Sequence, residues 1–299
     1  MKILITGSSG QLGKTLVQTI PEFFKKEEHE IVGLTRKDFD LLDLKSCEKI
    51  LKEFRPDWLI NTAAYTNVEK AEKEPLLAKS VNTIAPEFFA KILSYQGGKM
   101  LHLSTDFVFS CNQGKPYRTE QKMSPKCIYG ITKCDGEKAV RRYLPAFGFV
   151  LRTSWLYAGF GKNFLLTMLK LQREYAFQNK SIKVVSDQVG CPTSVSSLAS
   201  TCWEIVIQGE ANIPKILHWS DSGAASWYDF AIAIRDTALD KGLIKEKVDI
   251  QPIKASEYNS TVERPYYSLL DCSITEKSLR LKSQHWQKCL SKTLCEINK

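Results

Sequence analysis

Tyr129 and Lys133 have the residue types and the spacing that could support proton transfer, within the stretch YGITKCDGEK. Because they are four residues apart, a helix would carry both on one face. The pKa of a free tyrosine lies near 10, so its hydroxyl is a poor acid at neutral pH. A neighbouring ammonium stabilises the phenolate and lowers that pKa. Such a tyrosine can exchange a proton with a carbonyl or alcohol oxygen, although the same spacing also arises by chance on surface helices.

A second polar group precedes this pair in the stretch STDFVF. Ser104, Thr105 and Asp106 follow an apolar run that predicts a strand over Lys99–Ser104. They would therefore lie at the carboxyl edge of a sheet, where open α/β sheets bind their ligands. There, the hydroxyl of Thr105 is available to hydrogen-bond the oxygen that Tyr129 protonates.

Three glycines, Gly7, Gly10 and Gly13, occur in the stretch GSSGQLG between an apolar run and residues with helical spacing. This order predicts strand, turn and helix. Glycine tolerates positive φ and lets a backbone approach a ligand closely. The first N–H groups of a helix attract an anion. The turn therefore predicts a site for the pyrophosphate of a dinucleotide, with a plain tight turn as the alternative.

The end of the second predicted strand bears on the choice of cofactor. A carboxylate at this place selects NAD, whereas an arginine nearby accommodates the 2′-phosphate of NADP. Here the strand continues into Thr35, Arg36 and Lys37, and the first carboxylate is Asp38. A guanidinium matches a phosphate in a fork geometry. The sequence therefore predicts a preference for NADPH read by Arg36, and solvated loop charges are the alternative.

These groups must be positioned by alternating strands and helices, the pattern of a doubly wound, Rossmann-type parallel sheet in an α/β protein. We expect residues 1–154 to form a dinucleotide-binding domain and residues 155–299 to form mainly a smaller substrate-binding domain, with later segments returning to the sheet. The expected strands are Lys2–Thr6, Glu30–Leu34, Trp58–Asn61, Lys99–Ser104 and Phe147–Arg152; the expected helices are Lys14–Phe24, Ser46–Phe54, Ala78–Tyr95 and Ile131–Tyr143.

Composition narrows the class of protein. The 299 residues are 43% hydrophobic and 25% charged, which is ordinary for a globular protein. No apolar run approaches the roughly 18 residues that span a bilayer. The first apolar run is only Ile3-Leu4-Ile5, so we expect no signal peptide. We therefore expect no membrane partner and a cytoplasmic location.

Metal and nucleic-acid sites find little support in the sequence. The nine cysteines form no C-x-x-C, and the four histidines lie far from any cysteine pair, which argues against zinc. The net charge of +9 is spread along the chain. We expect no nucleic-acid partner. Binding to nucleic acid is an alternative that the positive charge suggests, but no sequence motif supports it.

The glycine pattern, the strand-end Ser/Thr and Y-x-x-x-K together resemble the extended short-chain dehydrogenases/reductases. The resemblance narrows to the dTDP-4-dehydrorhamnose reductase family. It implies reduction of the 4-keto group of dTDP-4-dehydro-L-rhamnose to dTDP-L-rhamnose, a nucleotide sugar for surface polysaccharide such as lipopolysaccharide. It also implies a nicotinamide cofactor, and because members of this family often accept both NADPH and NADH, we expect a preference for NADPH rather than exclusive use. The blocks that carry it are GQLGKTL, NTAAYTNVEKAE, VNTIAPEFFA, LSTDFVF, YGITKCDGEKAV, LRTSWLYAGFGKNFLLTML, VVSDQVGCPTS and ERPYYSLLD.

The resemblance assigns roles to individual residues. The catalytic residues are Thr105, Tyr129 and Lys133. The residues implied to bind the cofactor are Gly7, Gly10, Gln11, Leu12, Gly13, Asp43, Leu44, Ala63, Ala64 and Tyr65, together with Tyr129 and Lys133. Arg36 is expected to bind the cofactor because of its place after the second predicted strand, not because of the resemblance. Those implied to bind the substrate are Thr105, Asp106, Trp155, Asn163 and Arg264. A core aromatic is the alternative for Trp155, and a surface charge is the alternative for Arg264.

The chain departs from the family pattern near the substrate and at a metal site. It has Phe107 where the family usually has Tyr, and Ser110-Cys111 where the family usually has Asp-Gly. Lys14-Thr15 stands where some members carry a metal-binding Glu, so no metal is expected. Residues 240–262 fit the family pattern loosely.

Two other functions stay open besides the expected one. The first is a reductase or epimerase of another dTDP-4-keto sugar. The second is a non-catalytic regulatory subunit like the β subunit of methionine adenosyltransferase, against which the intact Thr105, Tyr129 and Lys133 argue. A homodimer is a further expectation.

Overall fold

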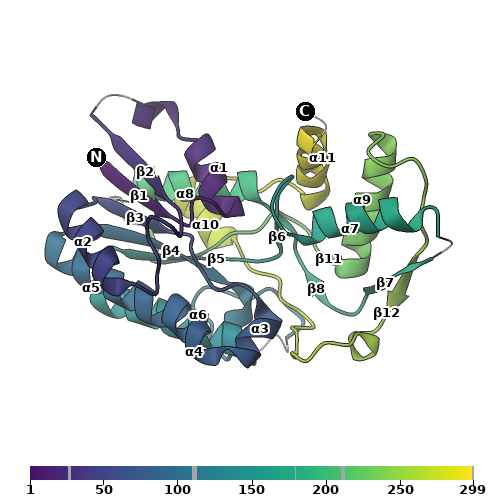
Figure 1. Ribbon diagram of the computed structural model, residues 1–299, viewed down its shortest axis with the longest axis horizontal. Helices are drawn as coiled ribbons and strands as arrows, with labels where there is room; N and C mark the ends of the chain where they lie inside the picture. The colour runs from purple at the N-terminus through teal and green to yellow at the C-terminus, as the bar shows by residue number, and fades with distance from the viewer. Residues whose placement is uncertain (26–27, 110–112, 179, 210–212, 298–299) are drawn as a thin grey trace.

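The computed structural model describes residues 1–25, 28–109, 113–178, 180–209 and 213–297. Its larger lobe is built on a six-stranded sheet in the order β10-β5-β4-β3-β1-β2 (Figure 1). Every neighbouring pair in this sheet is parallel. The predicted doubly wound α/β fold is confirmed. The strands are β1 (Lys2–Thr6), β2 (Glu30–Leu34), β3 (Trp58–Asn61), β4 (Lys99–Thr105), β5 (Gly148–Thr153) and β10 (Ile216–His218).

Helices cover both faces of this sheet, which explains why its strands are nearly continuous apolar runs. Ile3 and Ile5 of β1 face one core, and Leu4 between them faces the other. The helices on the first face are α1 (Gln11–Gln18), α8 (Val195–Gln208) and α10 (Ser273–Leu279); those on the second are α2 (Leu44–Phe54), α5 (Ala85–Gln96) and α6 (Ile128–Tyr143).

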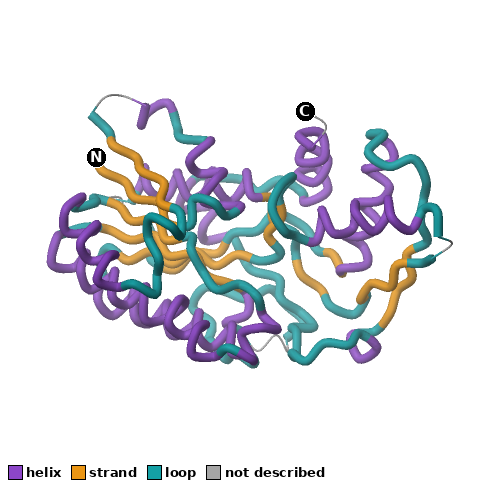
Figure 2. The backbone as a smooth tube through the Cα atoms, viewed as in Figure 1, coloured by secondary structure: helices purple, strands orange, loops and turns teal. Residues whose placement is uncertain are grey.

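The smaller lobe has its own core, in which Leu165, Phe230 and Leu290 are fully buried. Its strands pair two by two rather than forming one sheet (Figure 2). The division at residue 154 stays a prediction. The later segments α8, β10 and α10 lie in the larger lobe. The helices of the smaller lobe are α7 (Phe164–Tyr175), α9 (Trp227–Asp240) and α11 (Trp286–Ile297); its strand pairs are β6 (Leu156–Tyr157) with β9 (Thr193–Ser194), β7 (Ile182–Val185) with β12 (Ile250–Ile253), and β8 (Val189–Gly190) with β11 (Ala225–Ser226).

One predicted helix is broken in the structure, and another is longer than predicted and contains a π-helical turn. The helix expected over Lys14–Phe24 is α1, which begins earlier, followed by a short 3₁₀ helix over Glu22–Lys25. Pro21 separates them, since proline has no N–H to continue a helix. The helix expected over Ala78–Tyr95 is α4 (Pro75–Lys79), then a π-helical turn (Ser80–Ile84), then α5. A further short helix, α3 (Val68–Lys73), precedes them.

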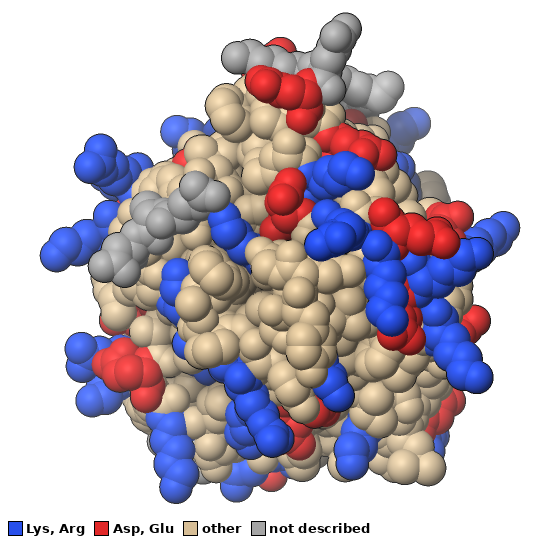
Figure 3. Space-filling model, turned by 90° about the vertical axis from the view of Figure 1, so that its left-hand side faces the viewer, with Lys and Arg blue, Asp and Glu red and all other residues tan. Residues whose placement is uncertain are grey.

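The surface carries charges of both signs. On the described atoms of the face in Figure 3, Lys and Arg side chains lie among Asp and Glu side chains rather than in one continuous basic patch. No helix in the described part of the chain combines the length and the apolar character needed to cross a membrane.

Candidate active site

Thr105 and Tyr129 meet at the carboxyl edge of the sheet. Thr105 is the last residue of β4, and Tyr129 lies in the first turn of α6, whose N-terminus is capped by Cys127. Burial raises the pKa of Tyr129 above its ordinary value, and the contact with the Thr105 hydroxyl partly offsets this effect. The sequence predicts the opposite direction, a pKa lowered by Lys133. The structure differs because desolvation outweighs any effect of that lysine.

Lys133 lies one turn further along α6 and is only 2% exposed. Its Nζ donates a hydrogen bond to the carbonyl oxygen of Leu103 at 2.5 Å and lies 3.4 Å from Nε2 of His102. Burial lowers the pKa of Lys133 to about 8, because a buried ammonium is poorly solvated. The lysine can therefore change its charge close to neutral pH.

Asp106 and Phe107 lie next to this pair. Asp106 accepts a hydrogen bond from Thr105 Oγ1 at 2.9 Å, and burial raises the pKa of its carboxyl to about 6. The ring of Phe107 packs edge-on against the ring of Tyr129 with centroids 5.6 Å apart. The other departure from the family pattern, Ser110-Cys111, lies outside the described residues.

The glycine turn forms a cradle that side chains would fill. Gly7 has a φ of +67°, and a Cβ at Gly13 would lie 2.3 Å from the carbonyl oxygen of Gly7. Gly10 is the N-cap of α1 and provides no side chain to bond the first N–H groups of the helix. These N–H groups and the close turn fit the pyrophosphate of a dinucleotide. Leu12 is buried and anchors α1 to the sheet.

Asn163 ties this turn to the smaller lobe. Its Nδ2 donates to Oε1 of Gln11 at 2.7 Å and to the carbonyl oxygens of Ala158 and Phe160. Its Oδ1 caps α7 through the backbone N–H of Leu166. The structure therefore places Asn163 beside the predicted cofactor turn.

At the end of β2, a basic side chain is exposed to solvent. The side chain of Arg36 is 76% exposed, and its Nε lies 3.6 Å from a carboxylate oxygen of Asp40. Asp38 is turned back, because its carboxylate accepts hydrogen bonds from the N–H and hydroxyl of Thr35. Asp43 caps α2 at Ser46, and Leu44 begins that helix.

The segment Ala63–Tyr65 follows β3 and faces the glycine turn. A Cβ at Gly7 would lie 3.0 Å from the backbone of Ala63. Asn82, in the π-helical turn, holds this segment through both backbone groups of Tyr65, at 2.8 and 3.0 Å. Asn82 is not among the predicted site residues. Its place in the quoted block VNTIAPEFFA was a usable signal.

A cavity of about 390 Å³ opens in the smaller lobe between α7, β7, α9 and the segment 255–266. Trp227 lines it, and Trp155 stacks flat on Trp227 with ring centroids 3.5 Å apart. Trp155 is held there at a φ of +45°, a backbone conformation rare for large residues. Trp227 was not predictable from the sequence, because its stacking partner lies 72 residues away in the chain.

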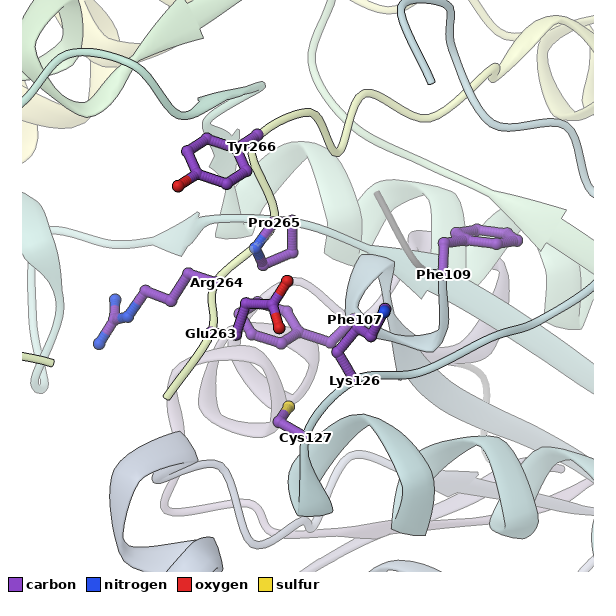
Figure 4. A pocket seen from close by; sticks show the side chains of 8 residues that line it. All are labelled: Phe107, Phe109, Lys126, Cys127, Glu263, Arg264, Pro265 and Tyr266. Carbon is purple, nitrogen blue, oxygen red and sulfur yellow. The ribbon is translucent and has the colours of Figure 1, made fainter. Parts of the chain in front are cut away.

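Arg264 connects this cavity to the catalytic edge. It lines the cavity and also a small pocket that contains Phe107 and Cys127, as Figure 4 shows. Its Nη2 lies 3.1 Å from Oε1 of Glu69 in α3, so one ion pair joins the two lobes. The two pockets share Glu263, Arg264 and Tyr266, and Phe107, which lines the small one, contacts the ring of Tyr129.

No group of three or more metal-ligating side chains occurs among the residues that the structure describes. At the place where metal-binding relatives carry a Glu, the Nζ of Lys14 lies 4.7 Å from the ring centroid of Phe160, and Thr15 bonds back to Gln11. The absence of a metal stays a prediction.

The family model described as RmlD substrate binding domain matches residues 1–298. The chain belongs to this family. The chain is 36% identical over 295 residues to the spore coat polysaccharide biosynthesis protein SpsK of Bacillus subtilis (strain 168), covering 99% of this chain and 97% of that one.

Solved structures of similar proteins agree with this family. A dTDP-4-dehydrorhamnose reductase of Clostridium acetobutylicum superposes with a TM-score of 0.90 at 31% identity, over 100% of both chains. A dTDP-4-dehydrorhamnose reductase of Bacillus anthracis in complex with NADP gives a TM-score of 0.88 at 31% identity, over 99% of both chains. The predicted family is confirmed.

Proposed function

We propose that this protein uses NADPH to reduce the 4-keto group of dTDP-4-dehydro-L-rhamnose to dTDP-L-rhamnose. The observation that carries the proposal is the meeting of Thr105 and Tyr129 with Lys133 at the sheet edge that also holds the glycine cradle. Similar proteins named dTDP-4-dehydrorhamnose reductase, one of them in complex with NADP, support both the substrate and the cofactor.

The chain's own residues would position the reaction and manage its proton. Burial keeps Tyr129 protonated at neutral pH, so its hydroxyl is ready to donate to the developing alkoxide. The single hydroxyl proton of Thr105, which bonds Asp106 in this structure, would turn to the same oxygen, where charge builds up. Lys133 supports the phenolate that Tyr129 becomes. When bound, the reduced nicotinamide supplies the hydride for the keto carbon.

The cradle of Gly7, Gly10 and Gly13 would hold the pyrophosphate of the cofactor, and Arg36 would bind its 2′-phosphate. The cavity of the smaller lobe would take the nucleotide of the substrate, with the thymine against Trp227 and the diphosphate near Arg264. An apolar, aromatic-lined cavity with few charged groups suits a nucleobase.

A second candidate, reduction of another dTDP-4-keto sugar, is favoured by one observation. Phe107 stands where the family usually has Tyr, and it contacts the Tyr129 ring at the catalytic edge. A phenyl ring lacks the hydroxyl with which a tyrosine would bond a sugar. The identity of the sugar is therefore the point that an experiment must decide.

Incubation with NADPH and dTDP-4-dehydro-L-rhamnose, followed by NMR of the product, tests the proposal. We expect oxidation of NADPH and the coupling constants of an L-rhamnosyl nucleotide. A product of different configuration would identify the second candidate. An absence of turnover with tight nucleotide binding would favour the regulatory subunit. The homodimer and the cytoplasmic location stay predictions.

A further inference from the structure

A row of polar side chains crosses the otherwise apolar sheet. Thr6 of β1 is in register with Asn61 of β3, and Asn61 is in register with His102 of β4. All three are at most 1% exposed. Thr6 Oγ1 donates to Asn61 Oδ1 at 2.7 Å, and Asn61 Nδ2 lies 3.1 Å from His102 Nδ1. His102 Nε2 completes the row 3.4 Å from Nζ of Lys133.

The hydrogen bonds of this row have a direction. Thr6 Oγ1 accepts from the N–H of Ala63 at 3.3 Å, so its own hydrogen is available for Asn61 Oδ1. This orients the amide of Asn61 with Nδ2 toward His102, whose Nδ1 must then accept. Burial and the nearby Lys133 lower the pKa of His102 well below its usual range, so the ring is neutral. A neutral imidazole carries one proton, which is therefore on Nε2 and points at Lys133.

An N–H directed at Nζ distinguishes the two charge states of Lys133. An ammonium has only donors and gains nothing from another donor, whereas a neutral amine can accept the hydrogen bond. The bond from Nζ to the carbonyl oxygen of Leu103 is compatible with both states.

Other titratable groups on the surrounding elements do not oppose this effect strongly. Glu137 on α6 favours the ammonium, but its carboxylate is paired with Arg152 of β5 at 2.7 Å. Tyr129 on α6 is neutral. Asp106, which follows β4, is bonded to Thr105 and is not among the groups that shift the pKa of Lys133. The charged side chains of α3 and α4 are exposed, and the π-helical turn has none.

We propose that His102 is a positioning residue that sets the proton affinity of Lys133. Oriented by Asn61 and Thr6, its Nε2–H stabilises the neutral amine and moves the proton exchange of the lysine toward neutral pH. This inference depends on the proposed function in one respect only, namely the reaction in which the lysine exchanges its proton.

The test is a pH titration of Lys133 itself. The protein is labelled with ¹³C-lysine, and the Cε signal of Lys133 is assigned by its loss in Lys133→Met. Without nucleotide, the wild-type signal should titrate near pH 8. His102→Leu removes the donor, and the midpoint should rise by about 1 pH unit. His102→Gln is the matched control: it keeps an N–H near the position of Nε2 and should titrate close to wild type.

Asn61→Asp reverses the hydrogen bond between residue 61 and His102, leaves the bond from Thr6 unchanged and hardly alters the side-chain volume. Its carboxylate would accept from Nδ1 of His102 and leave Nε2 as an acceptor, so the Lys133 midpoint should rise by about 1–3 pH units. If His102→Leu does not fold, Asn61→Asp and His102→Gln carry the test. The proposal would be overturned if the Lys133 midpoint stayed unchanged in folded His102→Leu and Asn61→Asp. It would also be overturned if the midpoint rose as much in His102→Gln as in His102→Leu.

The titration needs no substrate, so its failure is distinguishable from failure of the proposed function. A second readout is the alkaline limb of kcat/KM, which should move upward with the lysine in the same variants. An active enzyme with an unshifted Lys133 would overturn only the role of His102. A shifted Lys133 in a protein that reduces no keto sugar would overturn only the proposed function.

Discussion

Tyr129 is the residue whose substitution separates chemistry from binding. Tyr129→Phe keeps the ring contact with Phe107 but removes the proton donor. We expect kcat to fall by about 10²-fold or more, while the Kd of NADPH stays near wild type. Steady-state kinetics and a fluorescence titration measure the two effects. Tyr143→Phe, at the other end of α6, is the control and should keep full activity; a Tyr129→Phe enzyme with more than about a tenth of wild-type kcat would contradict the assignment.

Asp106 should make stability fall as pH rises. Burial raises the pKa of its carboxyl from 3.8 to about 6, so the folded protein keeps a proton that the unfolded chain has lost in this window. Asp106→Asn cannot titrate there. The free energy of unfolding of the variant, relative to wild type, should therefore increase by about 1–3 kcal/mol between about pH 4 and 7. Urea unfolding at both pH values measures it, and a constant difference would show that Asp106 is not perturbed.

Arg36 should select the cofactor. It is an exposed cation at the end of β2, where the carboxylate of Asp38 is bonded to Thr35 rather than available for a ribose. A hydrogen bond to a charged group contributes about 1.5–3 kcal/mol. The wild-type ratio of kcat/KM for NADPH over NADH should therefore fall by about one to two orders of magnitude in Arg36→Ala. Lys37→Ala is the control and should change the ratio less. Equal use of both cofactors by the wild type would exclude this role.

Local spacing was enough to predict Thr105, Tyr129 and Lys133 as a group, since a strand end and a helical i,i+4 pair are visible in the sequence. His102 and Asn82 were not predictable in this way. Their roles come from register between strands and from a π-helical turn, and neither leaves a periodic signal in the chain.

Among the elements, α7 depends on a residue that has two tasks. Asn163 caps the helix at Leu166 and also bonds Gln11 across the lobes. Asn163→Ala should lower the free energy of unfolding by about 0.5–2 kcal/mol through the lost cap alone. Asn163→Ser keeps a capping oxygen but is too short to reach Gln11, so it should recover part of that loss. Thermal and urea unfolding compare the variants; equal stability of Ala and wild type would show that the cap is not needed.

Strands were better predicted than helices, for a physical reason. The runs at β1, β2 and β3 have the predicted bounds, because each is a short apolar segment that turn residues enclose. Helix ends depend on caps and packing instead. The first turn of α1 begins with residues from the glycine motif, and the helix predicted over Ala78–Tyr95 contains a π-helical turn at Ser80–Ile84 that a hydrophobic pattern does not reveal.

At the scale of the whole molecule, the two halves of the sequence are interleaved. β10 pairs with β5, and α8 packs on the sheet face that α1 also covers. The change in composition near residue 155 predicts a second lobe, and one is present. The return of the chain could be expected only in outline, because contacts between residues far apart in the sequence have no local pattern.

This interleaving predicts that residues 1–154 cannot fold alone. Without α8, the apolar face formed by Ile3, Ile5 and Leu101 would lose its contacts with Leu198 and Trp203. Burial of one large apolar side chain contributes about 1.5–3 kcal/mol, and a domain is stable by only about 5–15 kcal/mol. The fragment should therefore give a poorly dispersed amide NMR spectrum and no cooperative thermal transition, whereas the full chain gives both. A fragment that unfolds cooperatively and binds NADPH would show instead that the dinucleotide-binding half is an independent domain, and that α8, β10 and α10 only add to its stability.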